Sequence, residues 1–228
     1  MVDQLWLWSM ILLLPALGLG IYAQVKVNSS FSQYSRVASA RGLTGAQAAR
    51  LLLDSAGLQE VDIRVAGSRL TDHYDPRTRM LTLSADVGMS NSLAALGVAA
   101  HEVGHAIQHA EGYVAFRLRG AMVPMANLGT NLGIILFLVG LIFYRSGMLM
   151  GVGILLYSAA VLFTLVTLPV EIDASRRALA LLADRNILVA DEISGARKVL
   201  TAAALTYVAA AVMAILQLLR LIALSRRS

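Results

Sequence analysis

Residues 87–105 read VGMSNSLAALGVAAHEVGH, and this stretch decides how the segment around it folds. Its first 14 residues, 87–100, carry no charge, but about 20 residues are needed to cross a bilayer. The run therefore predicts the buried start of a helix. Asn91 or Ser92 can cap this helix at its N-terminus, and Gly112 can end it.

The predicted helix carries two histidines four residues apart, His101 and His105, in the pattern H-E-x-x-H. Residues at this spacing differ by about 40° around the helix axis and by about 6 Å along it, so both imidazoles can bind one metal ion. Glu102 is rotated by about 100° from His101, which places it beside the ion as a candidate general base toward the attacking water. The alternative is a helix whose histidine and glutamate side chains hydrogen-bond within a core.

Two histidines need a third protein ligand, and the sequence limits the candidates. His109 lies eight residues beyond the first histidine, about 12 Å along the helix, so it cannot share the ion with both; we interpret it as a polar-face histidine or a substrate contact. Glu171 directly follows an apolar run, and a carboxylate at membrane depth is typical of a functional site. Asp173 is the second candidate. The alternative for Glu171 is a boundary residue paired with Arg176 or Arg177.

The chain as a whole is too apolar for a soluble protein. Of its 228 residues, 57% are hydrophobic and 14% are charged, whereas about 25% are charged in soluble domains. Four uncharged runs are long enough to cross a bilayer: 5–25, 120–144, 146–170 and 199–219. We expect four transmembrane helices, the second and third forming a tight hairpin because a single residue separates their runs. The absence of cysteine excludes disulfide scaffolds, iron–sulfur centres and thiol catalysis.

These runs divide the chain into five segments: a first transmembrane helix at 1–25, a catalytic segment at 26–119, a transmembrane hairpin at 120–170, a polar segment with the third ligand at 171–198, and a last transmembrane helix with its tail at 199–228. Two crossings separate the polar segments, so both lie on one side of the membrane and can build one site. They hold 15 of the 19 basic residues, which predicts a cytoplasmic location; Arg226 and Arg227 count against it. Basic residues beside apolar runs indicate a lipid bilayer as the partner and no nucleic acid.

Inside the catalytic segment, the hydrophobic pattern changes from helix to strand and back to helix. Residues 44–58 are amphipathic, with a threonine at the N-cap position and Gly57 near the end. Residues 61–65 and 79–83 alternate as strands do, and a turn at 75–78 precedes the second. The segment is therefore a small α+β unit.

Three stretches, 71–78, 101–109 and 168–179, resemble the YugP-type family of bacterial membrane-bound neutral zinc metallopeptidases. The likeness covers nearly the whole chain. More remotely, the chain is similar to gluzincin membrane proteases, the heat-shock and CAAX-processing relatives, whose third ligand heads a Glu-x-x-Ala-Asp pattern. Ser175 stands where those relatives carry the aspartate, which leaves Asp173 or a backbone carbonyl to brace a ligating histidine.

The resemblance implies a mainly α-helical integral membrane protein with a small α+β gluzincin-like catalytic domain on the cytoplasmic face of the inner (plasma) membrane. It implies one zinc ion per chain, held by His101, His105 and Glu171, with Glu102 as the catalytic base. The implied activity is that of a zinc metalloendopeptidase.

The same resemblance places the second predicted strand at a sheet edge beside the active-site cleft. An extended peptide could then pair with Met80, Leu81 and Thr82 as an added strand. His73 and Tyr74 precede this strand and could reach the cleft, although the polarity of a turn explains them equally well.

The function that best fits these features is cleavage of membrane proteins or unfolded proteins by a zinc-activated water. One alternative is a zinc-binding membrane scaffold or chaperone without turnover, which has no need of Glu102. A small transporter is the other, but it predicts ionisable groups inside the apolar runs, and these runs have none.

Overall fold

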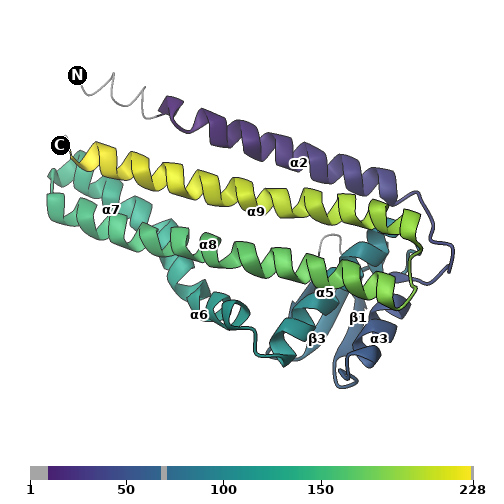
Figure 1. Cartoon of the computed structure of the whole chain (residues 1–228). Coiled ribbons are helices and arrows are strands. Elements are labelled where there is room, and N and C mark those ends of the chain that lie inside the picture. Colours follow the sequence, from purple (N-terminus) through teal and green to yellow (C-terminus); the bar gives the residue numbers. More distant parts are fainter. Residues whose placement is uncertain (1–9, 68–70, 227–228) are drawn as a thin grey trace. The chain divides into compact units, whose positions relative to one another are not determined.

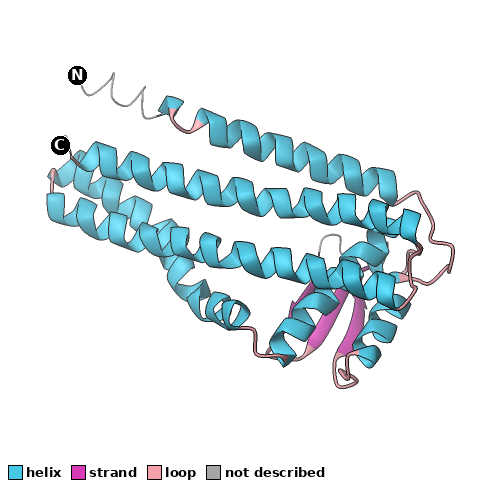
Figure 2. Ribbon diagram, viewed as in Figure 1, coloured by secondary structure: helices cyan, strands magenta, loops and turns pink. Residues whose placement is uncertain are grey.

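The computed structural model of the chain describes residues 10–67 and 71–226, most of which are helical (Figures 1 and 2). The described residues belong to two compact units. The first unit contains those within 1–23, 117–169 and 206–228. The second unit contains Gln24–Phe116 and Val170–Leu205. The helix α2 (Leu14–Tyr34) contributes residues to both.

Apolar helices make up the first unit. In chain order they are most of α6 (Val114–Leu128), the π-helical turn η1 (Gly129–Gly133), α7 (Ile134–Val139), a second π-helical turn η2 (Gly140–Tyr144), and parts of α8 (Gly147–Asp184) and α9 (Ala190–Ser225). Arg145 adopts a left-handed conformation (φ 43°) between η2 and α8, so the chain turns sharply between two apolar helices; a hairpin that crosses the membrane stays a prediction. Phe137, Met150 and Leu221 are among the side chains buried in the core of this unit.

Three helical stretches of the described chain are long and apolar enough to cross a membrane: Val114–Tyr144, Gly147–Asp184 and Ala190–Ser225. They contain the second, third and fourth apolar runs of the sequence. The expected first span, 5–25, lies partly outside the described residues. Four spans and a cytoplasmic catalytic side therefore remain predictions.

The second unit begins with a helix whose ends are set by its own sequence. The helix α3 (Gly45–Ser55) has a capping box, in which the Thr44 side chain accepts a hydrogen bond from the Gln47 backbone and the Gln47 side chain accepts one from the Thr44 backbone. Gly57, with φ +75°, follows the helix and allows the chain to leave it. The predicted helix is thus confirmed, three residues shorter at its C-terminal end.

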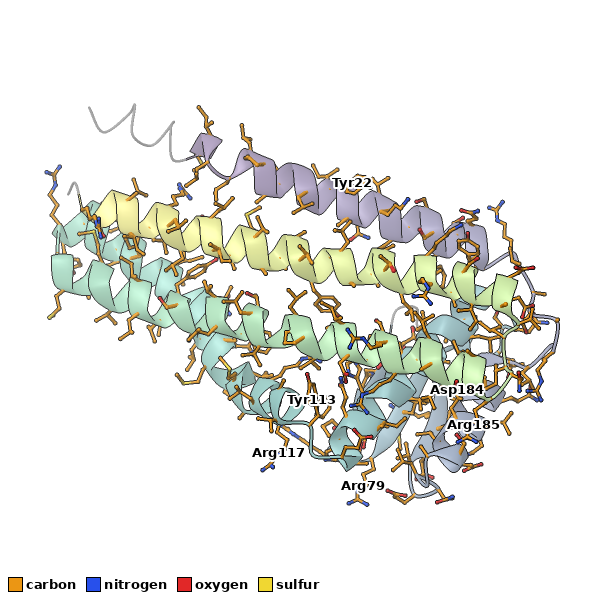
Figure 3. All side chains as sticks on the ribbon, in the orientation of Figure 1. Tyr22, Arg79, Tyr113, Arg117, Asp184 and Arg185 are labelled. Carbon is orange, nitrogen blue, oxygen red and sulfur yellow. The ribbon has the colours of Figure 1, made fainter. Side chains whose placement is uncertain are left out.

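A three-stranded sheet follows, drawn in magenta in Figure 2. Its strands are β1 (Asp62–Ala66), β2 (His73–Asp75) and β3 (Met80–Ser84), in the spatial order β1-β3-β2. β1 runs parallel to β3, and β2 runs antiparallel to it. Both predicted strands are confirmed, each one residue later than expected, whereas β2 was not predicted. Arg79, labelled in Figure 3, has a positive φ of 51° directly before β3.

The expected edge position of the 79–83 strand is wrong, because β3 is the central strand. Met80, Leu81 and Thr82 are each in register with a residue of β1 on one side and of β2 on the other. A strand paired on both sides has no free edge for a substrate. Among the described strands, β1 and β2 hold the edges, and β2 was missed because its three residues lie in a polar block without an alternating pattern.

The helix predicted from 87–105 is α5 (Leu93–Ala110), which packs in the core of the second unit. The Ser92 side chain caps it by accepting a hydrogen bond from the Ala95 backbone, and Gly112 follows its end with φ +66°. Its start is buried, as the uncharged run predicted, and its core-facing side chains lie in one cluster with Leu81 and Leu83 of β3. The rigid core thus holds the histidine-bearing helix against the sheet.

Candidate metal centre

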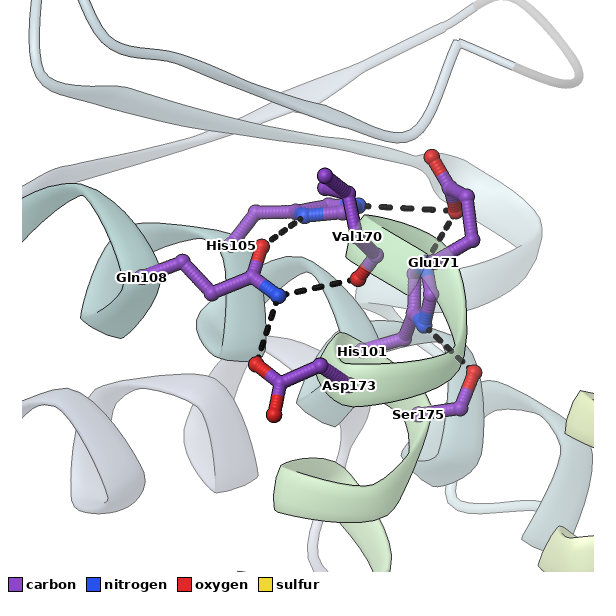
Figure 4. Close-up of polar contacts among 7 residues, drawn as sticks. All are labelled: His101, His105, Gln108, Val170, Glu171, Asp173 and Ser175. Atoms are coloured by element: carbon purple, nitrogen blue, oxygen red, sulfur yellow. Dashed lines mark hydrogen bonds and ion pairs between the residues drawn. The ribbon is translucent and has the colours of Figure 1, made fainter. Parts of the chain in front are cut away.

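Three side chains from two distant parts of the sequence converge in the second unit (Figure 4). His101 and His105 come from α5, Glu171 comes from α8, and the ligand atoms of all three lie within 4.8 Å of one another. The Glu171 Oε2 atom is 3.1 Å from His101 Nε2 and 3.7 Å from His105 Nε2. Atoms bound tetrahedrally at about 2.0–2.1 Å lie about 3.3 Å apart, so this spacing fits one zinc ion.

A glycine allows α5 and α8 to approach closely enough for this convergence. A Cβ on Gly104 would lie 2.7 Å from the Ala174 carbonyl oxygen and 3.1 Å from its Cα, so no larger residue fits without movement. On α8, Glu171 shares its face with Ala174, Ala178 and Leu182, which are fully buried. Burial of these three apolar side chains fixes the rotation of α8 about its axis. In that rotation Glu171, which is 2% exposed, points toward the histidines.

A buried glutamine that the sequence analysis missed determines the tautomer of His105. The Gln108 side-chain nitrogen donates hydrogen bonds to the Val170 carbonyl (2.9 Å) and to Asp173 Oδ2 (2.8 Å). Its amide oxygen must therefore face His105 Nδ1, 2.9 Å away, and accept a hydrogen bond from it. In the neutral imidazole, this leaves the Nε2 lone pair directed at Glu171 and available for a metal.

The predicted bracing role of Asp173 is therefore only indirect. Asp173 holds Gln108 instead of contacting a histidine, and it also accepts a 2.6 Å hydrogen bond from Arg177 Nε. Arg177 in turn donates to Glu111 (2.7 Å). Asp173 is thus committed to this network and is not part of the converging group.

The other histidine has a different brace. Ser175 Oγ lies 3.1 Å from His101 Nδ1, at the position where the remote relatives carry aspartate. A serine oxygen accepts the Nδ1 hydrogen as a carboxylate does, but without a negative charge. Both histidines therefore present Nε2 to the centre and are oriented through Nδ1, which is the arrangement of metal-binding histidines.

The electrostatics of the centre favour a cation. Burial alone lowers the pKa of His105, but the hydrogen bond that the protonated ring donates to Glu171 and the charges of Glu102 and Glu171 outweigh it and raise that pKa above its usual value. A bound proton and a bound metal would both satisfy this demand for positive charge. Below this raised pKa, metal binding therefore releases a proton from the site.

Glu102 lies next to the centre without taking part in it. It is 9% exposed, and among residues 10–67 and 71–226 no hydrogen-bond or ion-pair partner of its carboxylate is present. A poorly exposed carboxylate without a partner is costly unless a cation or a substrate compensates it. This is the environment expected of a carboxylate that exchanges protons with a substrate water.

His109, the remaining histidine of the helix, belongs to a separate contact. Its Nδ1 lies 2.9 Å from the Tyr74 hydroxyl of β2, and the Phe116 ring lies about 6 Å from the rings of both His105 and His109. Burial raises the pKa of Tyr74, so its hydroxyl stays protonated. His109 is outside the converging group, as its distance along the helix predicted.

The sequence contained a signal for Gln108 that was overlooked. Gln108 follows His105 by three residues and His101 by seven, so it shares their helix face. The contact of Ser175 with His101 had no such signal, because it depends on how closely two helices pack.

Comparison with known proteins agrees with this geometry. A family model described as "Putative neutral zinc metallopeptidase" matches residues 9–226. A protein of Bacillus subtilis (strain 168) called "Putative membrane protease YugP" is 46% identical over 211 residues, which covers 92% of this chain and 93% of that protein. No solved structure matches the chain.

Proposed function

The chain belongs to this family of neutral zinc metallopeptidases, and on that premise we propose that it is a membrane-bound zinc endopeptidase. The observation that carries the proposal is the convergence of His101, His105 and Glu171 within 4.8 Å. Two imidazole nitrogens and one carboxylate oxygen are the protein ligands typical of zinc hydrolases, in which the fourth position stays open.

One zinc ion per chain would be held by these three residues. When bound, it would polarise the scissile carbonyl and make the attacking water more acidic. The protein residues supply the remainder of the chemistry. Gln108 and Ser175 keep each histidine in the tautomer that presents Nε2.

Glu102 acts as the general base in this proposal. Its carboxylate accepts the proton of the attacking water and then donates it to the leaving amine. Its low exposure and its lack of a partner in the described chain support the assignment, because a carboxylate engaged in an ion pair would be a weaker proton acceptor. A purely structural zinc site would not need this residue.

The proposed substrates are membrane proteins or unfolded proteins near the bilayer surface. Glu171 follows the apolar run 146–170 without an intervening residue, which puts one ligand at the end of a candidate span. The basic residues of the two polar segments favour the cytoplasmic face of the plasma membrane. The related Bacillus protein is likewise called a membrane protease.

The test compares Glu102→Gln with the wild type and with Glu60→Gln, all purified in detergent. Glu60 is an exposed carboxylate whose ion pair with Arg79 is 3.7 Å long, so its substitution controls for loss of one charge. We expect Glu102→Gln to keep its zinc and to cleave casein about 10²–10⁴-fold more slowly, while Glu60→Gln behaves as wild type.

Two results would contradict this assignment. Full proteolysis by Glu102→Gln would remove the catalytic base. A wild-type protein that binds zinc but cleaves neither casein nor membrane proteins would favour the scaffold alternative.

A further inference from the structure

A groove in the second unit lies outside the proposed catalytic chemistry. It is formed by the C-terminal part of α8 and the N-terminal part of α9, and its volume is about 600 Å³. Its lining is largely apolar, and Ile172, Leu179, Ile193 and Leu200 are its largest aliphatic side chains. Ser175, which contacts His101, also lines it.

Two arginines, Arg176 and Arg197, supply all the charge in the lining of this groove. Both are exposed, and within the described parts of the chain neither has an ion pair or a side-chain hydrogen bond. The neighbouring Arg177 shows the contrast, because Asp173 and Glu111 engage it fully.

The acidic side chains nearby are already engaged. Asp173 holds Arg177 and Gln108, and Glu192 accepts hydrogen bonds from the backbone of Ala40 and of Val189. The lining of the groove therefore presents two guanidinium groups beside the apolar side chains that form its floor, and it contains no acidic residue. The nearest carboxylate whose charge acts on Arg176 is that of Asp173, which Arg177 and Gln108 hold. Guanidinium groups bind phosphate through paired hydrogen bonds.

The sequence places both arginines next to the bilayer. Arg176 lies six residues after the apolar run 146–170, and Arg197 lies two residues before the run 199–219. Basic pockets between transmembrane helices at this level are suited to lipid headgroups. A free anion would leave the apolar floor bare, whereas an acyl chain would cover it.

We propose that this groove binds one anionic phospholipid, with its phosphate between Arg176 and Arg197 and an acyl chain along Ile172, Leu179 and Leu200. Zwitterionic lipids carry a positive group beside the phosphate, which the two arginines repel. The site is therefore selective for phosphatidylglycerol over phosphatidylcholine. Binding does not depend on the proposed protease activity.

Native mass spectrometry of the full chain in an uncharged detergent tests the proposal. The probe is phosphatidylglycerol, with phosphatidylcholine of the same acyl chains for comparison. We expect wild-type protein to retain one phosphatidylglycerol in preference to phosphatidylcholine. The double variant Arg176→Gln/Arg197→Gln should bind it at least about tenfold more weakly, because each lost guanidinium removes a charge-assisted hydrogen bond.

Two further variants make the result specific. Arg77→Gln/Arg79→Gln removes the same charge from the turn before β3, far in sequence from the apolar runs, and should bind lipid as wild type does. Ala180→Glu places a carboxylate in the lining, on an exposed helix position, and should weaken binding without disturbing the core.

Three results would overturn the proposal. One is equal phosphatidylglycerol binding by the wild type and by the Arg176→Gln/Arg197→Gln and Ala180→Glu proteins. Another is equal retention of phosphatidylglycerol and phosphatidylcholine by the wild type. The last is complete displacement of the lipid by an equal concentration of glycerol phosphate, which would show that the arginines bind the anion alone and that the apolar floor contributes nothing.

Discussion

Replacing Gly104 by alanine should weaken zinc binding, although the two histidines and the glutamate of H-E-x-x-H stay unchanged. The added Cβ would lie 2.7 Å from the Ala174 carbonyl oxygen, against a relaxed separation of about 3.4 Å between such atoms. The helices must therefore separate by about half an ångström or more. Metal sites tolerate shifts of about 0.2 Å in ligand position, so Glu171 would leave bonding range.

The expected size of the effect follows from this overlap. Overpacking a tight contact costs about 1–3 kcal/mol, which the better helix propensity of alanine offsets by about 1 kcal/mol or less. We expect zinc affinity to fall by at least about tenfold and the thermal midpoint to fall in detergent. Titration with zinc in a competing chelator measures the affinity.

Gly97→Ala is the matched control. Gly97 lies on the same helix, and its added Cβ would meet the nearest atom, Ala196 Cβ, at 3.5 Å, an ordinary contact. This variant should keep its zinc affinity and lose no stability, because alanine favours the helix and meets no clash. Unchanged zinc affinity in Gly104→Ala would refute the claim that close helix packing positions Glu171.

Three other outcomes follow from the structure. Gln108→Leu keeps the side-chain volume but loses the hydrogen bond to His105 Nδ1. Zinc affinity, measured by competition with a chelator, should therefore fall about 10–100-fold. Unchanged affinity would show that the amide does not orient the ring. Because the pKa of His105 is raised in the metal-free centre, zinc must displace a proton once the pH is below that pKa. Isothermal titration over a pH series should therefore show weaker binding as the pH is lowered, and a flat profile would contradict this. Thr44→Ala removes the capping box of α3 and should lower the free energy of unfolding by about 1 kcal/mol, measured by denaturant titration in detergent; an unchanged free energy would show that the cap does not stabilise the helix.

The secondary structure near the site could be predicted because its signals are local. Thr44 and Ser92 cap helices through their own side chains, and Gly57 and Gly112 supply the left-handed conformations after them. Alternation marked two strands for the same reason. The order of the strands depends on tertiary packing, so the sequence did not show that β3 is central.

In the metal centre, too, the features set by local sequence could be predicted, and those set by tertiary packing could not. Helix spacing alone was enough to pair His101 with His105. The position of Glu171 directly after an apolar run made it the first candidate for the third ligand, and the resemblance to the family agreed with that choice. Gln108 orients His105 within α5, so its spacing on that helix was a usable signal. The contact of Ser175 with His101 could not be predicted, because it crosses from α8 to α5. The close packing of these two helices requires a residue without a Cβ at position 104. The hydrophobic pattern of the sequence gives no sign of this requirement.

The proposed activity depends on two histidines and one distant carboxylate that bind a single zinc ion. The most direct test of this binding is the zinc content per chain of detergent-purified wild type, His101→Ala and Glu171→Ala, measured by inductively coupled plasma mass spectrometry after dialysis against a weak chelator. We expect about one zinc per wild-type chain and strong loss in both variants, because each removes one of three protein ligands. Equal zinc in all three proteins would contradict this expectation.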